Sequence, residues 1–152
     1  MSTTIELLGA QHQEVLARLD SVEGTLDGHG DLAAFLAYLE RDVMQHFAVE
    51  EEALFPILAH HLSLSQGPLA VMNAEHAAFR ELLGNLRTAV GTADRAAQRM
   101  RAQELIELLR AHIAKEDHVL FPMASQLLSV DEQQEVDARA AAIGTSAPSA
   151  HA

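Results

Sequence analysis

The chain of 152 residues contains no cysteine. This excludes disulfides, thiolate ligands, iron–sulfur clusters and zinc ribbons, so any bound metal must be held by nitrogen and oxygen atoms. No apolar run approaches the roughly 18 residues that cross a bilayer, and the N-terminus lacks a basic stretch followed by an apolar one. These absences predict a cytoplasmic protein with no membrane partner.

Basic residues are also scarce, with 10 Lys and Arg against 22 Asp and Glu, for a formal charge of −12. Nucleic acids and anionic membrane surfaces both require clustered positive charge, so neither is expected as a partner. The hydrophobic content of 49% and the charged content of 21% are typical of a soluble globular protein. The length suits one domain with a single core.

Apolar residues recur at spacings of three and four in long segments, which predicts amphipathic helices. Four are expected, over residues 3–26, 32–57, 68–90 and 94–128, and none of the chain shows convincing strand alternation. A short fifth helix is expected from Ser129 to about residue 143, followed by a disordered tail over residues 144–152. The predicted fold is all-α: an up-down-up-down four-helix bundle over residues 1–143, made from two tandem helical hairpins.

Several details of these helices are open to test. Asp31 should cap the second helix, and either Thr92 or Asp94 should begin the fourth. Pro56 removes one intrahelical hydrogen bond, which predicts a kink or an early end of the second helix. The inward stripe of the fourth helix is expected to include Val119 and Leu127.

An eleven-residue run occurs twice in the chain. In the first copy His46 is the first residue and Glu50 the fifth, and His112 and Glu116 hold the same places in the second copy. Both copies end in Leu-Phe-Pro, at the same offset as the histidines and glutamates. Histidine and glutamate four residues apart lie one above the other on a helix face. Each copy therefore offers a nitrogen ligand beside a carboxylate, a pair suited to iron, manganese or zinc.

The repeat also includes His12 and His76, which follow Ala10-Gln and Ala74-Glu at nearly the same offset. A single histidine on an apolar stripe is more often a hydrogen-bonded core residue than a ligand. Two antiparallel hairpins would, however, bring four histidines and two glutamates to one level, and such a buried network is hard to satisfy without a cation. The predicted metal ligands are His12, His46, Glu50, His76, His112 and Glu116.

The other polar residues have more ordinary interpretations. His29 and His151 should lie in a loop and in the tail, His60 and His61 near a helix end, and His118 should point away from the cluster. Glu51 and Asp117 flank the proposed glutamates and are either hydrogen-bonded to the ligands or simply solvated. Tyr38 is interpreted as a core residue, although it could approach the cluster.

These motifs resemble the hemerythrin-like family, also known as the HHE cation-binding domain, over about residues 5–128. The resemblance implies a four-helix bundle with a non-haem di-iron centre, oxo- or hydroxo-bridged, and chemistry with oxygen, peroxide or nitric oxide. It assigns His12 and His46 to one iron, His76 and His112 to the other, and Glu50 and Glu116 to both, with Asp117 as the alternative to Glu116. Oxygen-carrying members have a further histidine four residues after the third one, where this chain has Arg80.

With only two imidazoles for each iron, both ions would keep exchangeable positions, which favours reaction or sensing over oxygen carriage. Ferritin-like proteins use Glu-x-x-His motifs, and no histidine here follows a glutamate at that spacing. The expected function is binding or processing of a small oxidant, either as a di-iron oxidoreductase, with peroxide decomposition ranked first, or without turnover. The alternative is an iron- or oxygen-responsive sensor or interaction module, and a structural zinc or manganese bundle is a third possibility.

Overall fold

The computed structural model describes residues 2–28 and 32–143, and within these ranges every regular element is a helix. α1 (Thr3–Glu23) is followed by a broken second helix, which contains α2 (Leu32–Tyr38), α3 (Met44–Val49) and α4 (Phe55–Leu58). The third and fourth long helices are α5 (Pro68–Val90) and α6 (Arg95–Lys115), and the chain ends in α7 (Phe121–Leu127) and α8 (Val130–Ala142). The predicted all-α fold is therefore confirmed.

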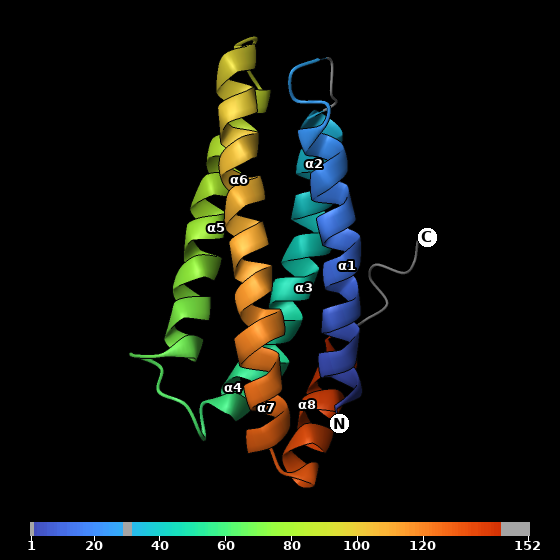
Figure 1. Cartoon of the computed structure of the whole chain (residues 1–152), viewed down its shortest axis with the longest axis vertical. Coiled ribbons are helices and arrows are strands. Elements are labelled where there is room, and N and C mark those ends of the chain that lie inside the picture. Colours follow the sequence, from blue (N-terminus) through green and yellow to red (C-terminus); the bar gives the residue numbers. More distant parts are fainter. Residues whose placement is uncertain (1, 29–31, 144–152) are drawn as a thin grey trace.

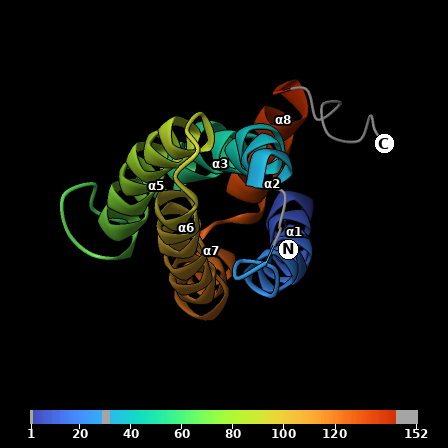
Figure 2. The same cartoon turned by 90° about the horizontal axis from the view of Figure 1, so that it is seen from above.

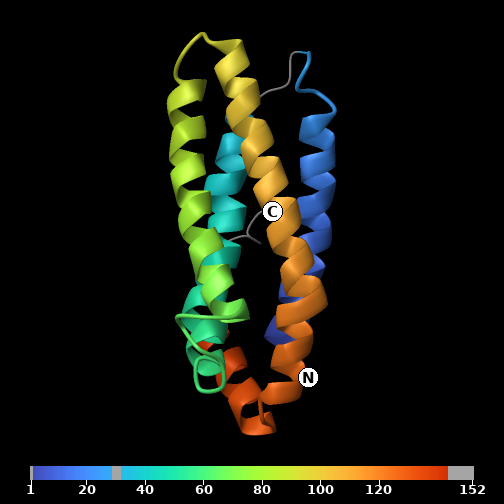
Figure 3. The same cartoon turned by 60° about the vertical axis from the view of Figure 1, so that its left-hand side comes forward.

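The long helices run along one axis and surround a common core (Figures 1 and 2). Seen from above, α1, the α2–α3 helix, α5 and α6 follow one another around the bundle, so neighbours in sequence are neighbours in space. Figure 3 shows α8 at the end of the bundle where α4 and α7 lie. This is the predicted up-down-up-down bundle with a short C-terminal helix.

Local signals explain most helix boundaries. Ser2 caps α1 by accepting hydrogen bonds from the amides of Thr4 and Ile5, and Asp94, rather than Thr92, caps α6. Gly67 precedes α5 with a φ of 90°, a conformation that L side chains rarely adopt. The predicted capping of the second helix by Asp31, and the predictions for His29, His151 and residues 144–152, lie outside the described residues.

Three π-helical turns interrupt the helices: η1 (Leu39–Val43), η2 (Glu50–Leu54) and η3 (Glu116–Leu120). η2 and η3 begin at the two duplicated glutamates, and each is followed within two residues by a proline, Pro56 or Pro122. A wider turn accommodates the carbonyl that a proline ring leaves without a donor. The predicted disturbance near Pro56 is thus a π-turn, after which α4 continues only to Leu58.

The π-turn in the fourth helix explains one error of the sequence analysis. Val119 and Leu127 were expected inside, but they are 44% and 38% exposed. η3 carries more residues than an α-helical turn, so the spacing of three and four loses its phase across it. Phe121 and Ala124 are buried instead.

The core consists of two apolar clusters. One, near α4, α7 and α8, contains Leu8, Leu54, Met72 and Leu120, and the other contains Val15, Val43, Phe79 and Leu109 among its members. Along every long helix, the predicted ligands fall between a residue of one cluster and a residue of the other. No helix in the described part of the chain is long and apolar enough to span a membrane.

Candidate metal centre

All six predicted ligands are buried in one polar layer between the two apolar clusters. Glu50 and Glu116 have no exposed surface, and none of the four histidines is more than 6% exposed. They form two groups, within each of which the candidate ligand atoms lie within 4.8 Å of one another. The groups are His12, His46, Glu50 and Glu116, and Glu50, His76, His112 and Glu116.

The two glutamates belong to both groups because their oxygens face in different directions. Glu50 places Oε2 at 3.1 Å from Nε2 of His46 and Oε1 at 3.0 Å from Nε2 of His76. Glu116 places Oε1 at 3.0 Å from Nε2 of His12 and Oε2 at 3.4 Å from Nε2 of His112. Each carboxylate therefore offers one oxygen to each pair of histidines, which is the arrangement required of a bridging ligand.

Many of these atoms have no hydrogen-bond partner although they are close together. Among the described residues, seven buried side-chain nitrogen and oxygen atoms lack one, and six of the seven belong to this layer. They are Nε2 of His12, His76 and His112, Oε1 of Glu50, and both carboxylate oxygens of Glu116. Buried polar atoms are normally satisfied, so converging free donor atoms of this kind fit a metal ion well.

The two buried glutamates of this layer have strongly shifted pKa values. Burial and the neighbouring charge of Glu116 raise the pKa of Glu50 well above its usual range. Burial also opposes ionisation of Glu116, but the close imidazoles of His112, His12 and His46 outweigh it and hold the pKa of Glu116 well below its usual range. Without a cation, the two adjacent carboxyl groups thus resist carrying two negative charges together.

The imidazoles also respond to their surroundings. Burial lowers the pKa of His76 to about 4, which keeps this ring neutral, as a metal ligand must be. Its face is covered by Phe47, with ring centroids 3.8 Å apart and planes 9° apart. Burial acts the same way on His112, but the charges of Glu116 and Glu50 outweigh it and raise the pKa of His112.

Each histidine also binds a polar side chain through Nδ1, on the side away from the layer. These partners are Asp117 for His12, Gln11 for His46, Glu51 for His76 and Glu75 for His112. The open question about Glu51 and Asp117 is therefore answered: both accept hydrogen bonds from the layer's histidines. Asp117 consequently does not replace Glu116 inside the layer.

Gln11 and Glu75 were missed by the sequence analysis. Each directly precedes a histidine, His12 or His76, but binds a different histidine on the next helix of its own hairpin. The available signal was the repeat itself, because Gln11 and Glu75 are related by the same offset as the histidines that follow them.

The remaining residues lie outside the layer. His118 is exposed, as expected, and Arg80 pairs with Glu51 instead of facing the ligands. His61 and His60 contact Glu132 of α8. Tyr38 is a core residue, and its ring lies beneath the guanidinium of Arg18 at 4.4 Å.

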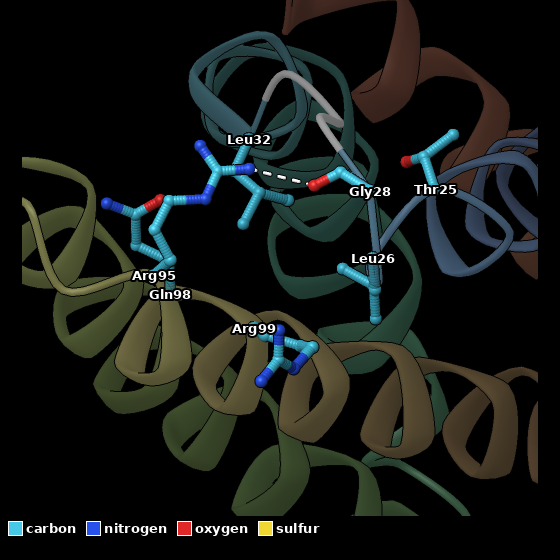
Figure 4. Close-up of a pocket in the computed structure, with 7 residues that line it drawn as sticks. All are labelled: Thr25, Leu26, Gly28, Leu32, Arg95, Gln98 and Arg99. Carbon is cyan, nitrogen blue, oxygen red and sulfur yellow. Dashed lines mark hydrogen bonds between the residues drawn. The ribbon is translucent and has the colours of Figure 1, made fainter.

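A small cavity of about 10 Å³ adjoins the layer on the side away from α8. It is lined by His12, His46 and His112 together with Val15, Val43, Phe47, Leu109 and Ile113. This volume is about that of one water-sized probe. A separate hollow, shown in Figure 4, lies between the end of α1 and the start of α6, where Arg95 donates a hydrogen bond to the carbonyl of Gly28, and it contains none of the candidate ligands.

A four-helix bundle with two histidine–glutamate groups in its core defines a class of metal-binding protein, and comparison with known families identifies it. The hemerythrin HHE cation binding domain model matches residues 3–124, and the chain belongs to this family. Membership implies iron binding. α8 begins after the matched region, at Val130.

The chain is also similar to curated iron–sulfur cluster repair proteins YtfE. Those of Enterobacter sp. (strain 638), Citrobacter koseri and Escherichia coli O1:K1 are each 32% identical to it over 102 residues, which are 61% of this chain and 46% of the relative. The match thus covers less than half the length of these relatives. No solved structure matches the chain significantly.

Proposed function

We propose that this protein holds a pair of iron ions between its two hairpins and binds or processes a small oxidant there: peroxide, oxygen or nitric oxide. The proposed ligands are His12 and His46 for one ion, His76 and His112 for the other, and Glu50 and Glu116 for both. The proposal is carried by the free imidazole and carboxylate atoms that converge in a buried layer. The two carboxylates would offset part of the positive charge of the ions, and the neutral imidazoles would supply nitrogen ligands without adding charge.

The residues around the ligands support this role in three ways. Hydrogen bonds at Nδ1 fix the orientation of each imidazole and turn Nε2 into the layer, where Nε2 of His12, His76 and His112 has no hydrogen-bond partner and Nε2 of His46 contacts Glu50. The apolar clusters on both sides exclude bulk water. The small cavity beside His12 and His46 suits a molecule of a few atoms. Bound iron would supply electron exchange with that molecule.

The test is to load the purified protein with ferrous iron under anaerobic conditions and then add oxygen, peroxide and nitric oxide separately. We expect about two iron ions per chain and an optical change with at least one oxidant. His112→Ala should lose that response, whereas His118→Ala, which changes an exposed histidine a few residues away, should keep it. Binding of fewer than about one ion per wild-type chain would refute the dinuclear centre.

A second candidate function comes from the relatives named for iron–sulfur cluster repair. The aligned part of this chain would then take part in repair through its iron, rather than consume an oxidant. Incubating the iron-loaded protein with an enzyme whose cluster has been damaged separates the two: recovery of that enzyme without oxidant turnover favours repair. If neither occurs, but metal raises the melting temperature strongly, the protein acts as an iron-responsive module.

A further inference from the structure

The groups that surround the four histidines are not the same in the two hairpins. The Nδ1 atoms of His12 and His76 lie 2.7 Å from a carboxylate oxygen of Asp117 and 2.6 Å from one of Glu51. Asp117 and Glu51 directly follow the two duplicated glutamates, so this part of the surroundings follows the duplication. Because a carboxylate only accepts, Nδ1 donates in both cases and Nε2 keeps its lone pair for a metal.

The other two histidines break the symmetry. His112 has its Nδ1 at 2.8 Å from a carboxylate oxygen of Glu75, whereas His46 has its Nδ1 at 2.8 Å from the neutral amide oxygen of Gln11. Gln11 and Glu75 occupy equivalent positions in the repeat, each directly before a histidine of the layer. At Nδ1, on the side away from the layer, one of the four imidazoles is thus hydrogen-bonded to an uncharged group.

Among the described residues, cations pair with the outer carboxylates only around His76 and His112. Arg80 donates to Glu51 at 2.7 Å, and Lys115 pairs with Glu75, so both carboxylates that serve His76 and His112 are anchored by a cation. The equivalent positions in the first half are Leu16 and Val49. Among the described residues, no Lys or Arg pairs with Asp117.

We infer that the two proposed metal sites have unequal affinity: the ion at His76 and His112 is held more tightly, and the ion at His12 and His46 exchanges first. The inference rests on the proposed metal pair. A carboxylate that accepts from Nδ1 makes the imidazole a stronger ligand and fixes its orientation, and loss of such a partner typically weakens metal binding by about 10- to 100-fold. Both histidines of the tighter site have this partner, but only one histidine of the weaker site does.

Two other observations bear on the same difference. Arg80 and Lys115 are 42% and 47% exposed, so solvent screens their repulsion of an ion in the core, and their main effect is to hold Glu51 and Glu75 in place. The small cavity is lined by both histidines of the weaker site and by one histidine of the tighter site, His112. More of this free space therefore borders the ion that is less firmly held.

The test exchanges the two partners, using Zn²⁺ alone as a redox-inert probe in calorimetric titrations with a competing chelator. Wild-type protein should bind zinc in two steps whose affinities differ by about 10- to 100-fold. Gln11→Glu should strengthen the weaker step, and Glu75→Gln should weaken the tighter one. In both variants the two zinc affinities should become similar. Both affinities should be high in Gln11→Glu and low in Glu75→Gln.

Ligand variants assign each step to its site. His12→Ala should remove the weaker step and His76→Ala the tighter one. Gln13→Glu is the matched control for Gln11→Glu, since it adds the same charge at an exposed position of α1. Circular dichroism spectra of all variants establish that the bundle is intact, and Glu75→Gln, which keeps size and hydrogen bonding, gives a second independent reading if Gln11→Glu misfolds.

Two equal zinc affinities in wild-type protein would overturn the inference and leave the metal pair intact. The same holds if Gln11→Glu changes zinc affinity no more than Gln13→Glu does. Binding of less than about one zinc ion per chain would instead refute the metal pair itself.

Discussion

The two hairpins of this bundle are alike at the six candidate ligands and different around them. Each supplies one histidine from its first helix and a His-x-x-x-Glu pair from its second, and the π-turn begins at the glutamate in both. One layer further out, Gln11 stands where the second hairpin has Glu75, and the counterparts of Arg80 and Lys115 in the repeat are apolar. The comparison shows that Glu50 and Glu116 contact histidines of both hairpins, whereas the groups that orient those histidines differ from one hairpin to the other.

The ends of the two hairpins differ as well. After the second hairpin the chain turns back as α8, which packs against η2, α4 and α1. Asp137 of α8 accepts hydrogen bonds from the Ser2 hydroxyl and the Thr4 amide, and Val136 has no exposed surface. The helix α8 thus packs against the first hairpin, in which the groups around the histidines carry fewer charges.

The largest expected effect is the loss of the shared glutamates. Glu50→Ala and Glu116→Ala should each reduce the affinity for both ions, by more than the roughly 10- to 100-fold typical of an outer partner, because each carboxylate faces both pairs of histidines. His12→Ala should weaken only one site. Elemental analysis after dialysis against a chelator measures this, with Glu52→Ala as the exposed control. A Glu50→Ala protein that retains both ions would show that the halves are independent.

The next effect concerns the packing of α8 against the first hairpin. Val136→Ala removes buried apolar volume between α8 and the cluster of Leu54 and Phe55, and should lower the free energy of unfolding by about 2 kcal/mol. Urea unfolding of the metal-free protein measures it. Val130→Ala, which truncates a side chain that is 70% exposed on the same helix, should change little. Equal effects of both variants would mean that α8 does not support the bundle.

The fold and the convergence of the six candidate ligands in one buried layer were predictable because both depend on repeated patterns. Spacings of three and four define the long helices, and a duplicated motif indicates which polar residues share a level. The π-turns were not predictable from that spacing, and they reversed the expected positions of Val119 and Leu127. Gln11 and Glu75 were missed since their roles depend on how the second helix of each hairpin packs against the first, which helical spacing does not encode; only their common offset in the repeat pointed to them.

The contribution of α8 to the free energy of unfolding should depend on pH through Glu132. This residue completes the capping box with Ser129, and Nε2 of His61 at the end of α4 lies 2.9 Å from its carboxylate. The Ser129 amide and His61 lower the pKa of Glu132 to about 2, below its usual value of 4.5. The charged form is therefore favoured by folding, and its contribution is complete above pH 4.5 and is lost as the pH falls toward 2.

Glu132→Gln keeps the capping geometry but removes this charge. The difference in unfolding free energy between wild type and variant should be constant above about pH 5 and should shrink between about pH 4.5 and 2. Urea titrations at several pH values measure it, and Glu135→Gln, one turn along α8, serves as the comparison. A difference that grew on acidification would mean that the carboxyl group is stabilised in its protonated form.

The smallest effect should come from making the second hairpin resemble the first at its outer layer. Arg80→Leu introduces the residue that occupies the equivalent position, Leu16, and removes the cation from Glu51. Glu51 keeps its hydrogen bond from His76, so the two zinc-binding steps should approach each other less than they do in Glu75→Gln. Exposed ion pairs contribute about 0–1 kcal/mol to stability, so the free energy of unfolding should change by less than about 1 kcal/mol. The control is Arg87→Leu, which removes another arginine of α5 and breaks its pair with Glu40 of η1. If Arg87→Leu reduces the difference between the two zinc affinities equally, the effect of Arg80 is one of general charge rather than of its contact with Glu51.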